Sequence, residues 1–220
     1  MYASDCINHE IPFLQPEDKG LTALSLLEEL NISEIPVVDN DNYLGLVTEL
    51  DLLDYDCIDG EIKNLGAELK KPHIYEDDHL FEAVSLIVSE ELSVLPVLSK
   101  EEKYLGCIDQ LTALKRIADA EAFKSQGGVL ELEMGIHDYS MAEISRLVES
   151  NDIKIIHSYV NASPDSKKVK LTLKLNKPNL SRLISTLERF NYIITASFQQ
   201  DEYEEDLKKR YDSFLRYLNT

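Results

Sequence analysis

The residues best suited to ligand chemistry form one short stretch in the first quarter of the sequence, Gly45-Leu46-Val47-Thr48-Glu49-Leu50-Asp51. It lies where a predicted strand gives way to a predicted helix, a junction whose free backbone N–H groups suit an anion. The Thr48 hydroxyl can bond to a phosphate or ribose oxygen, and the Asp51 carboxylate, one helical turn further, can accept two hydrogen bonds from a ribose diol. These groups predict a nucleotide-type site. The apolar residues that can line a slot for its base are Ile35, Pro36 and Leu46.

The same two polar residues also have a purely local interpretation. Thr48 can cap the helix that follows it, and Asp51 can complement the dipole at the N-terminus of that helix. The sequence leaves both interpretations open.

A second copy of this stretch, Gly106-Cys107-Ile108-Asp109-Gln110-Leu111-Thr112, carries the polar residues in exchanged positions. Asp109 stands where the hydroxyl is expected, and Thr112 stands where the carboxylate is expected. An acidic group facing a phosphate should repel it unless a metal ion intervenes. We therefore expect one competent site at most, or an unusual ligand. The apolar counterparts in this copy are Leu95 and Pro96.

The elements that must position these residues recur along the chain with an offset of 60. In each copy apolar residues lie at i, i+1 and i+4, which predicts an amphipathic helix. A short apolar run with an internal proline follows each helix, as at the start of a strand. The aligned helical residues are Ala23-Leu24, Leu26-Leu27 and Ile32 in the first copy and Ala83-Val84, Leu86-Ile87 and Leu92 in the second.

Each copy is predicted to have the order β-α-β-β-α. Extended segments are expected at 11–14 and 72–75 before the helices, and further helices at 50–55 and 110–124. A unit of this size buries little surface alone, so the two copies should pack together as one module. The copies cover about residues 1–61 and 62–124.

A different pattern begins after Ser125-Gln126-Gly127-Gly128, which we expect to be a hinge. Over residues 129–200 strand-like alternation and amphipathic stretches predict the order βαββαβ, the ferredoxin-like arrangement, with a hairpin turn at Ser163-Pro164-Asp165-Ser166. Residues 201–220 are expected to form a charged C-terminal helix whose apolar stripe could pack on the body or on a partner. The fold class predicted for the chain is α+β in two domains.

The paired copies resemble the CBS-domain family, and together they resemble a CBS pair, or Bateman module. The resemblance covers roughly residues 1–122, and residues 45–51 match the family's Gly-hydrophobic-x-Thr/Ser-x-x-Asp adenosyl-binding pattern in full. It implies a regulatory, non-catalytic module whose ligand is AMP, ATP with Mg²⁺, or S-adenosylmethionine. The ligand-binding positions that it implies are Ile35, Pro36, Leu46, Thr48, Asp51, Leu95, Pro96, Asp109 and Thr112.

Residues 129–199 resemble the ACT family in element order, and a CBS pair followed by such a domain is similar to the acetoin-utilisation type of regulatory protein. In the ACT family an Asp and a Gly near the first strand–helix junction form the ligand loop. Here the junction Gly135-Ile136-His137-Asp138-Tyr139-Ser140 does not reproduce the Asp-x-x-Gly spacing, which argues against a ligand there. His137 and Asp138 lie beside that loop and are its two candidate functional residues.

Charge and hydropathy exclude two classes of partner. The net charge is −19, and residues 1–125 hold 9 Lys/Arg against 27 Asp/Glu, while residues 126–220 hold 13 against 14. A first half with this much negative charge would repel a nucleic-acid backbone. It also disfavours a free triphosphate as the ligand, whereas AMP, a neutral adenosyl compound or a Mg²⁺-bridged nucleotide is easier to accommodate. No apolar run of about 18 residues is present, so membrane insertion is not expected.

Catalytic and metal constellations are not found in the sequence. Cys6, Cys57 and Cys107 are scattered, which suits a reducing cytoplasm and small buried thiols. The acidic cluster from Asp51 to Glu61 is expected to be a solvated helix end and loop, and the five histidines are isolated. We therefore expect no enzyme and no metal site.

The sequence thus favours a cytoplasmic regulatory protein that binds a small adenosyl ligand, forms a homodimer, and passes its state to a protein partner or to the second domain. The alternative is a ligand-free structural module for dimerisation or partner binding. The exchanged motif in the second copy and the acidity of the first half favour that alternative.

Overall fold

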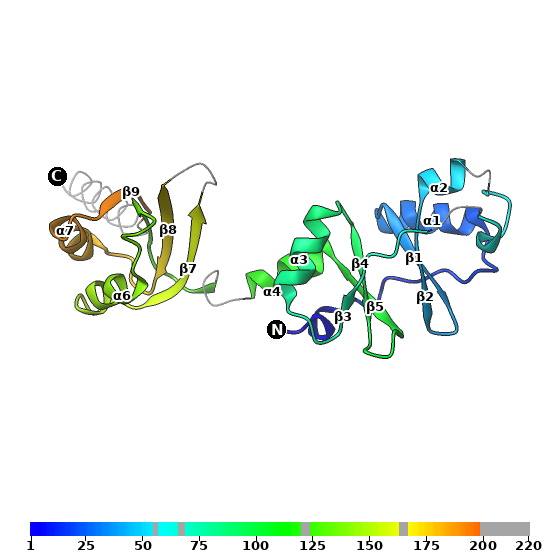
Figure 1. Cartoon of the computed structure of the whole chain (residues 1–220), viewed down its shortest axis with the longest axis horizontal. Helices are drawn as coiled ribbons and strands as arrows, with labels where there is room; N and C mark the ends of the chain where they lie inside the picture. The colour runs from blue at the N-terminus through cyan, green and yellow to red at the C-terminus, as the bar shows by residue number, and fades with distance from the viewer. Residues whose placement is uncertain (55–56, 66–68, 120–123, 163–166, 199–220) are drawn as a thin grey trace, which may run out of the picture. The chain divides into compact units, whose positions relative to one another are not determined.

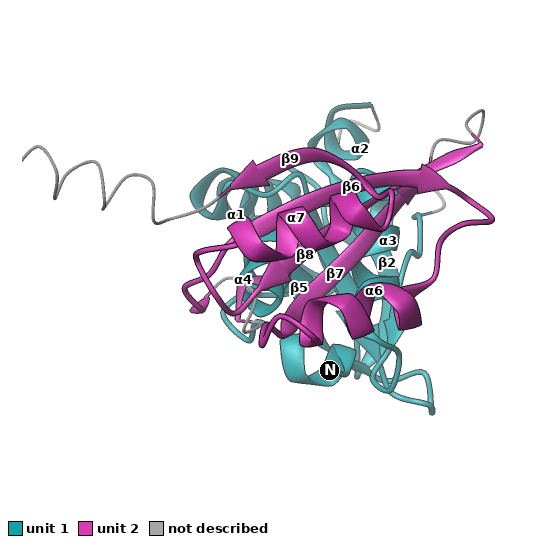
Figure 2. Ribbon diagram, turned by 90° about the vertical axis from the view of Figure 1, so that its left-hand side faces the viewer, with its two compact units in different colours: residues 1–117 teal, residues 118–220 magenta. Residues whose placement is uncertain are grey.

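The computed structural model describes residues 1–54, 57–65, 69–119, 124–162 and 167–198. The chain divides into two compact units, Met1–Ile117 and Ala118–Thr220 (Figures 1 and 2). The predicted turn at 163–166 and the predicted helix at 201–220 lie outside the described residues.

The first unit contains the two repeats, and the predicted mixed α+β fold is confirmed. In each repeat an amphipathic helix precedes an antiparallel strand pair, and a second helix follows directly. The elements of the first repeat are α1 Gly20–Leu30, β1 Glu34–Asp39, β2 Asn42–Thr48 and α2 Glu49–Asp54. Those of the second repeat are β3 Ile74–Tyr75, α3 Leu80–Ser89, β4 Val94–Leu98, β5 Tyr104–Asp109 and α4 Gln110–Ala118.

The first predicted strand of each repeat is shorter than its extended segment. In the second repeat it is the two-residue β3, which pairs in parallel with β4. In the first repeat it is reduced to a single bridging residue, Leu14, which pairs in parallel with Val37. Both short strands complete the edge of a sheet whose centre is the apolar run with the internal proline.

Each repeat packs against the segment that precedes the other repeat. The 3₁₀ turn η1 Ala3–Cys6 packs against the second repeat, and the Asn8 N–H donates to the Cys107 carbonyl of β5 at 2.8 Å. The 3₁₀ turn η2 Ile62–Asn64 packs into the first repeat, and the Leu46 N–H of β2 donates to the Lys70 carbonyl at 2.9 Å. The N-terminal segment of each repeat therefore packs on the other repeat, and we call these the exchanged segments.

Two glycines make this exchange sterically feasible. Gly45 has φ +143° and Gly106 has φ +144°, where side chains are rarely tolerated. A Cβ atom on Gly45 would lie 2.4 Å from the Leu69 Cβ, and one on Gly106 would lie 2.5 Å from the Ile7 Cγ2. The glycine that begins each heptapeptide thus allows the segment preceding the other repeat to pass close to the strand.

The second unit has the predicted order βαββαβ. Its four strands form one antiparallel sheet in the order β7-β8-β6-β9, and the two helices cover one face of it (Figure 2). Alternation along β8 buries its leucines in the core, as predicted from the period of two. The elements are β6 Val129–Gly135, α6 Met141–Glu149, β7 Ile155–Ala162, β8 Lys168–Leu175, α7 Ser181–Arg189 and β9 Ile193–Phe198.

Gly128, within the expected hinge, is hydrogen-bonded to other residues of the second unit. The Gly128 N–H donates to the Lys177 carbonyl at 2.9 Å, and the Gly128 carbonyl accepts from the Leu175 N–H at 2.9 Å. A hinge at residues 125–128 stays a prediction.

Candidate functional site

Two clefts lie between the repeats at positions related by the internal repeat. We call cleft A the one beside Thr48 and Asp51, with a volume of about 660 Å³. Cleft B is its counterpart beside Asp109, with a volume of about 360 Å³. Cleft A is lined by Glu34, Leu46, Thr48, Leu50, Asp51, Asp54, Lys70, Pro72, Glu90, Glu91 and Leu92.

Thr48 and Asp51 satisfy each other across the first turn of α2. The Thr48 hydroxyl donates to Asp51 Oδ2 at 2.7 Å, the Thr48 N–H donates to the same oxygen at 2.9 Å, and the Asp51 N–H donates to Thr48 Oγ1 at 3.2 Å. This is a reciprocal cap, the local role that the sequence allowed. Asp51 Oδ1 accepts no hydrogen bond from the described residues, so the second carboxylate oxygen stays available to a ligand.

The cap also changes the expected anion chemistry of the junction. Both backbone N–H groups of Thr48 and Asp51 are already paired, one of them with a carboxylate. A phosphate at this junction would have to displace that carboxylate. The geometry therefore suits a diol or hydroxyl ligand better than an anion.

The predicted apolar contacts separate into two groups. Leu46 lines cleft A, as expected. Ile35, Pro36, Leu95 and Pro96 are buried in the interior of the first unit and do not lie along either cleft. Ile35 and Leu95 have no exposed surface, each inside the core of its own repeat. These proline-containing runs are the central strands of the sheets. They therefore position the elements that line the clefts and do not line the clefts themselves.

The carboxylate that lines cleft B is already engaged by neighbouring residues. Asp109 accepts from the Thr112 N–H at 2.8 Å, from the Thr112 hydroxyl at 2.6 Å and from the Asn8 side-chain amide at 2.9 Å. Burial opposes ionisation of Asp109, but these hydrogen bonds outweigh it and lower the pKa of the carboxyl group below its usual value. Asp109 lines cleft B and Thr112 does not. With Asp and Thr in exchanged positions, the second repeat keeps a cap at the start of α4, and both oxygens of the Asp109 carboxylate accept hydrogen bonds.

Sequence reasoning missed Glu34, a residue of cleft A with only 4 % of its surface exposed. It begins β1 and reaches across to the second repeat, where its Oε1 accepts from the Ser93 N–H, from the Ser93 hydroxyl at 3.0 Å and from the Val94 N–H at 2.9 Å. The signal was present in the sequence as an acidic residue directly before the apolar run Ile35-Pro36-Val37-Val38. Strongly buried glutamates are rare unless paired.

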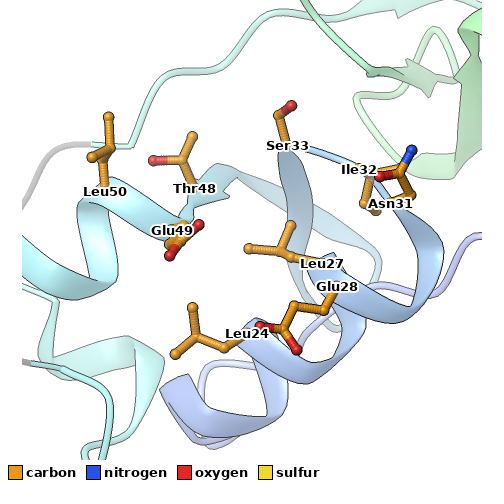
Figure 3. A pocket seen from close by; sticks show the side chains of 9 residues that line it. All are labelled: Leu24, Leu27, Glu28, Asn31, Ile32, Ser33, Thr48, Glu49 and Leu50. Atoms are coloured by element: carbon orange, nitrogen blue, oxygen red, sulfur yellow. The ribbon is translucent and has the colours of Figure 1, made fainter.

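A groove on the helical side of each repeat adjoins the clefts, and the groove of the first repeat shares Thr48 and Leu50 with cleft A. Figure 3 shows the groove of the first repeat, about 470 Å³ in volume, with Leu24 and Leu27 of α1 and Glu49 and Leu50 of α2 among the residues that line it. The groove of the second repeat lies between α3 and α4, has a volume of about 450 Å³ and is more apolar, with Val88 and Leu114 on its rim. The second groove therefore offers mainly hydrophobic surface, whereas polar side chains such as Glu28 and Glu49 also line the first.

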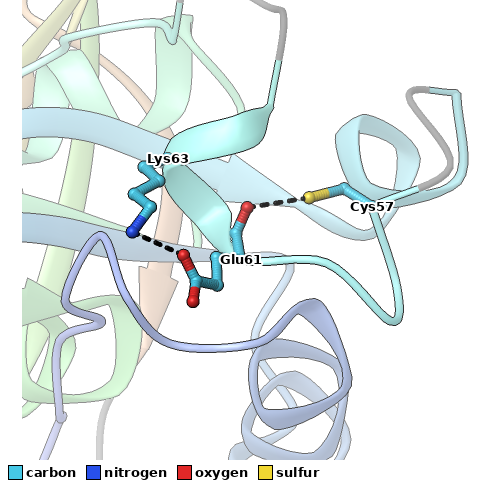
Figure 4. Close-up of polar contacts among 3 residues, drawn as sticks. All are labelled: Cys57, Glu61 and Lys63. Atoms are coloured by element: carbon cyan, nitrogen blue, oxygen red, sulfur yellow. Dashed lines mark hydrogen bonds and ion pairs between the residues drawn. The ribbon is translucent and has the colours of Figure 1, made fainter.

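The cysteines have the character of buried thiols. The Cys57 Sγ donates to the Glu61 carbonyl at 3.2 Å, and the Glu61 carboxylate is paired with Lys63 at 2.5 Å (Figure 4). Burial raises the pKa of the Cys57 thiol, and burial likewise raises that of Cys107 to about 12. Both groups are therefore poor nucleophiles.

No grouping of three or more His, Cys, Asp or Glu side chains suited to a metal ion occurs among the described residues. The same residues include no helix of the length and apolarity needed to span a bilayer.

A protein-family model described as "CBS domain" matches residues 3–57 and 67–119. An inosine-5'-monophosphate dehydrogenase of Methanocaldococcus jannaschii is 26 % identical over 164 residues, which are 71 % of this chain and 32 % of that protein. The chain thus spans about a third of the length of this curated relative.

Similar solved structures align with about half of the chain. One is a CBS domain pair/ACT domain protein from Thermotoga maritima, with a TM-score of 0.49, 22 % identity, and 55 % of this chain and 99 % of that chain covered. Another is CBSX2 in complex with AMP, with a TM-score of 0.45, 19 % identity and coverage of 53 % and 95 %.

Proposed function

The chain carries a tandem pair of CBS domains, at residues 3–57 and 67–119, and from this premise we propose that it is a regulatory protein that binds an adenosyl ligand in cleft A. CBS domains are generally regulatory modules with ligands of this class. The observation that carries the proposal is the placement of Thr48 and Asp51 on the wall of a cleft of about 660 Å³, large enough for a nucleoside. We propose no catalytic role.

The walls of cleft A divide into polar and apolar parts suited to such a ligand. The free Oδ1 of Asp51 would accept from the ribose diol, and Thr48 Oγ1, whose proton is donated to Asp51, would accept from a ribose hydroxyl. Leu46 from the first repeat and Leu92 from the second would contact the base from two sides. A ligand held by both repeats would couple their relative positions, which is how binding would be passed on.

We predict that Asp51→Ala weakens adenosyl binding by about tenfold or more, because a hydrogen bond to a charged acceptor contributes about 1.5–3 kcal/mol. Titration calorimetry with AMP, with ATP and Mg²⁺, and with S-adenosylmethionine would measure it. Thr112→Ala is the matched control, since it removes the side chain at the corresponding position of the cap beside cleft B and should leave the affinity of cleft A within about twofold.

Melting curves of both variants would measure how much stability each loses from its weakened cap, about 1 kcal/mol. Absence of heat with all three ligands would refute an adenosyl site in this protein. An equal loss of affinity in Asp51→Ala and Thr112→Ala would show that Asp51 affects binding only through the stability of the fold and does not contact the ligand.

A second candidate function, a ligand-free dimerisation module, is favoured by the apolar surface of the helices. The helices α2, α3 and α4 carry exposed large hydrophobic residues from both repeats, some of them on the rims of the two helical grooves, an arrangement typical of a protein–protein contact. The exposed residues are Leu50 (69 %), Leu53 (50 %), Phe81 (69 %), Val88 (70 %), Leu111 (57 %) and Leu114 (62 %). We propose that a second copy of the chain covers them.

Light scattering should then give about twice the monomer mass of 25.1 kDa, and Val88→Glu with Leu114→Glu should shift the mass to the monomer, since both place a charge in the contact. A monomeric wild-type protein would rule out the homodimer. If dimerisation were the whole function, saturating nucleotide would leave the melting temperature unchanged.

The second unit is proposed to be an ACT-like regulatory domain. Its element order βαββαβ and its strand order support this. We further propose that the protein acts in the cytoplasm and that its partners are a small ligand and other protein chains, without nucleic acid.

A further inference from the structure

Glu34 is a buried carboxylate held between the repeats. All three of its hydrogen bonds, from the Ser93 N–H, the Ser93 hydroxyl and the Val94 N–H, reach the same oxygen, Oε1. This oxygen fastens the start of β1 to the start of β4. The side chain is thereby fixed in one orientation, and the position of its second oxygen is fixed with it.

The second oxygen, Oε2, faces cleft A. It accepts no hydrogen bond from the described residues, and no fully buried side-chain oxygen among them lacks a partner, so Oε2 must have some access to solvent. Since Glu34 lines cleft A, that access is through the cleft. No Lys, Arg or His among the described residues forms an ion pair with Glu34. An almost fully buried carboxylate without a counter-charge is costly unless a bound group compensates it.

Most of the other charges of cleft A are negative, like that of Glu34. Asp51, Asp54, Glu90 and Glu91 line it together with one cation, Lys70. A cleft with walls of one sign concentrates ions of the opposite sign and repels those of its own. In the second repeat the position of Glu34 is taken by Val94, so cleft B has no equivalent carboxylate.

We propose that Glu34 determines the specificity of cleft A: its free Oε2 faces a positive charge on the ligand, so that the cleft selects a cationic adenosyl compound, the class of S-adenosylmethionine, over a phosphorylated nucleotide. The inference rests on the proposed adenosyl site and adds the sign of the ligand's charge. A sulfonium placed against Oε2 would compensate the buried carboxylate. A phosphate in the same place would add a second uncompensated anion.

The experiment uses a pair of ligands that differ in this charge and little else. S-adenosylmethionine and S-adenosylhomocysteine differ by one methyl group and the positive charge on sulfur. We expect the wild-type chain to bind the charged compound at least about tenfold more tightly in calorimetry without added metal. Glu34→Gln should reduce that ratio to about one, because the amide keeps an Oε1 acceptor for Ser93 and Val94 and replaces Oε2 with a neutral donor. AMP should bind more tightly to Glu34→Gln than to the wild type.

Glu82→Gln is the matched control, since it removes the same charge from an exposed position on α3 that lines neither cleft. It should change the ratio by less than about threefold, because exposed charges are screened. A melting temperature close to that of the wild type in both variants would show that the two repeats still pack together.

The outcomes distinguish the inference from the function beneath it. If no adenosyl compound binds, the proposed function itself fails. If AMP binds the wild type more tightly than S-adenosylmethionine, or if the ratio survives in Glu34→Gln, the site stands and the role of Glu34 is refuted. Binding of AMP that needs Mg²⁺ and also needs Glu34 would likewise refute it, since the carboxylate would then face a metal ion.

Discussion

Gly45→Ala is expected to lower the free energy of unfolding of the first unit by about 2 to 4 kcal/mol. Two costs combine: an alanine at φ +143° is strained, by about 1–3 kcal/mol, and its Cβ would approach the Leu69 Cβ to 2.4 Å. The crossing segment must move away from β2, which breaks the hydrogen bond from the Leu46 N–H to the Lys70 carbonyl. Urea unfolding followed by circular dichroism would measure the loss.

Gly60→Ala is the control for this prediction, because a Cβ there would meet the Cys57 Sγ at 3.5 Å, an ordinary contact distance. Its effect should stay within about 1 kcal/mol. Since Leu46 and Lys70 both line cleft A, Gly45→Ala should also weaken any ligand of that cleft. Equal stability of the two variants would mean that the exchanged segment does not cross β2 closely.

Leu173→Ala is expected to lower the free energy of unfolding of the second unit by about 3 to 5 kcal/mol, the cost of emptying a fully buried leucine site. Leu173 has no exposed surface and lies on β8, between Leu130 of β6 and Ser158 of β7. Hydrogen exchange followed by mass spectrometry would localise the loss to residues 129–198.

The same variant tests whether the ligand site is complete within the first unit. All residues that line cleft A belong to Met1–Ile117, so adenosyl affinity should change by less than about twofold in Leu173→Ala. Ile193→Ala, at a position 56 % exposed on β9, is the matched control and should cost under about 1 kcal/mol. Loss of adenosyl binding in Leu173→Ala would show that the second unit contributes to the site.

The parts of the fold that depend on local pattern could be predicted. The helices α1 and α3 follow from apolar spacing, and the strand pairs follow from the apolar runs and the polar turns between them. The second unit likewise follows from alternation along β6 and β8. These signals are short-range, because a helix or strand must turn its apolar side chains to one face.

The candidate site could be predicted only in part. Thr48 and Asp51 were identified because their spacing places both at one helix start, and the structure brings them together. Ile35 and Leu95 were expected along the ligand slot and lie in the cores instead, because a run buried on both faces of its sheet gives no sign of which neighbour it faces. Glu34 was not identified, since its partners Ser93 and Val94 are some 60 residues away.

The sequence by itself determined the repeat, the order of the elements in both units, and the residue types at each helix start, since these depend on contacts within a few residues. Only the tertiary structure decided which segment completes which repeat, which carboxylates are already engaged, and which oxygen is left facing cleft A. Those outcomes depend on pairs such as Leu46 with Lys70, Asn8 with Asp109, and Glu34 with Ser93. Such pairs form only when two distant segments pack, and no local pattern encodes their partners.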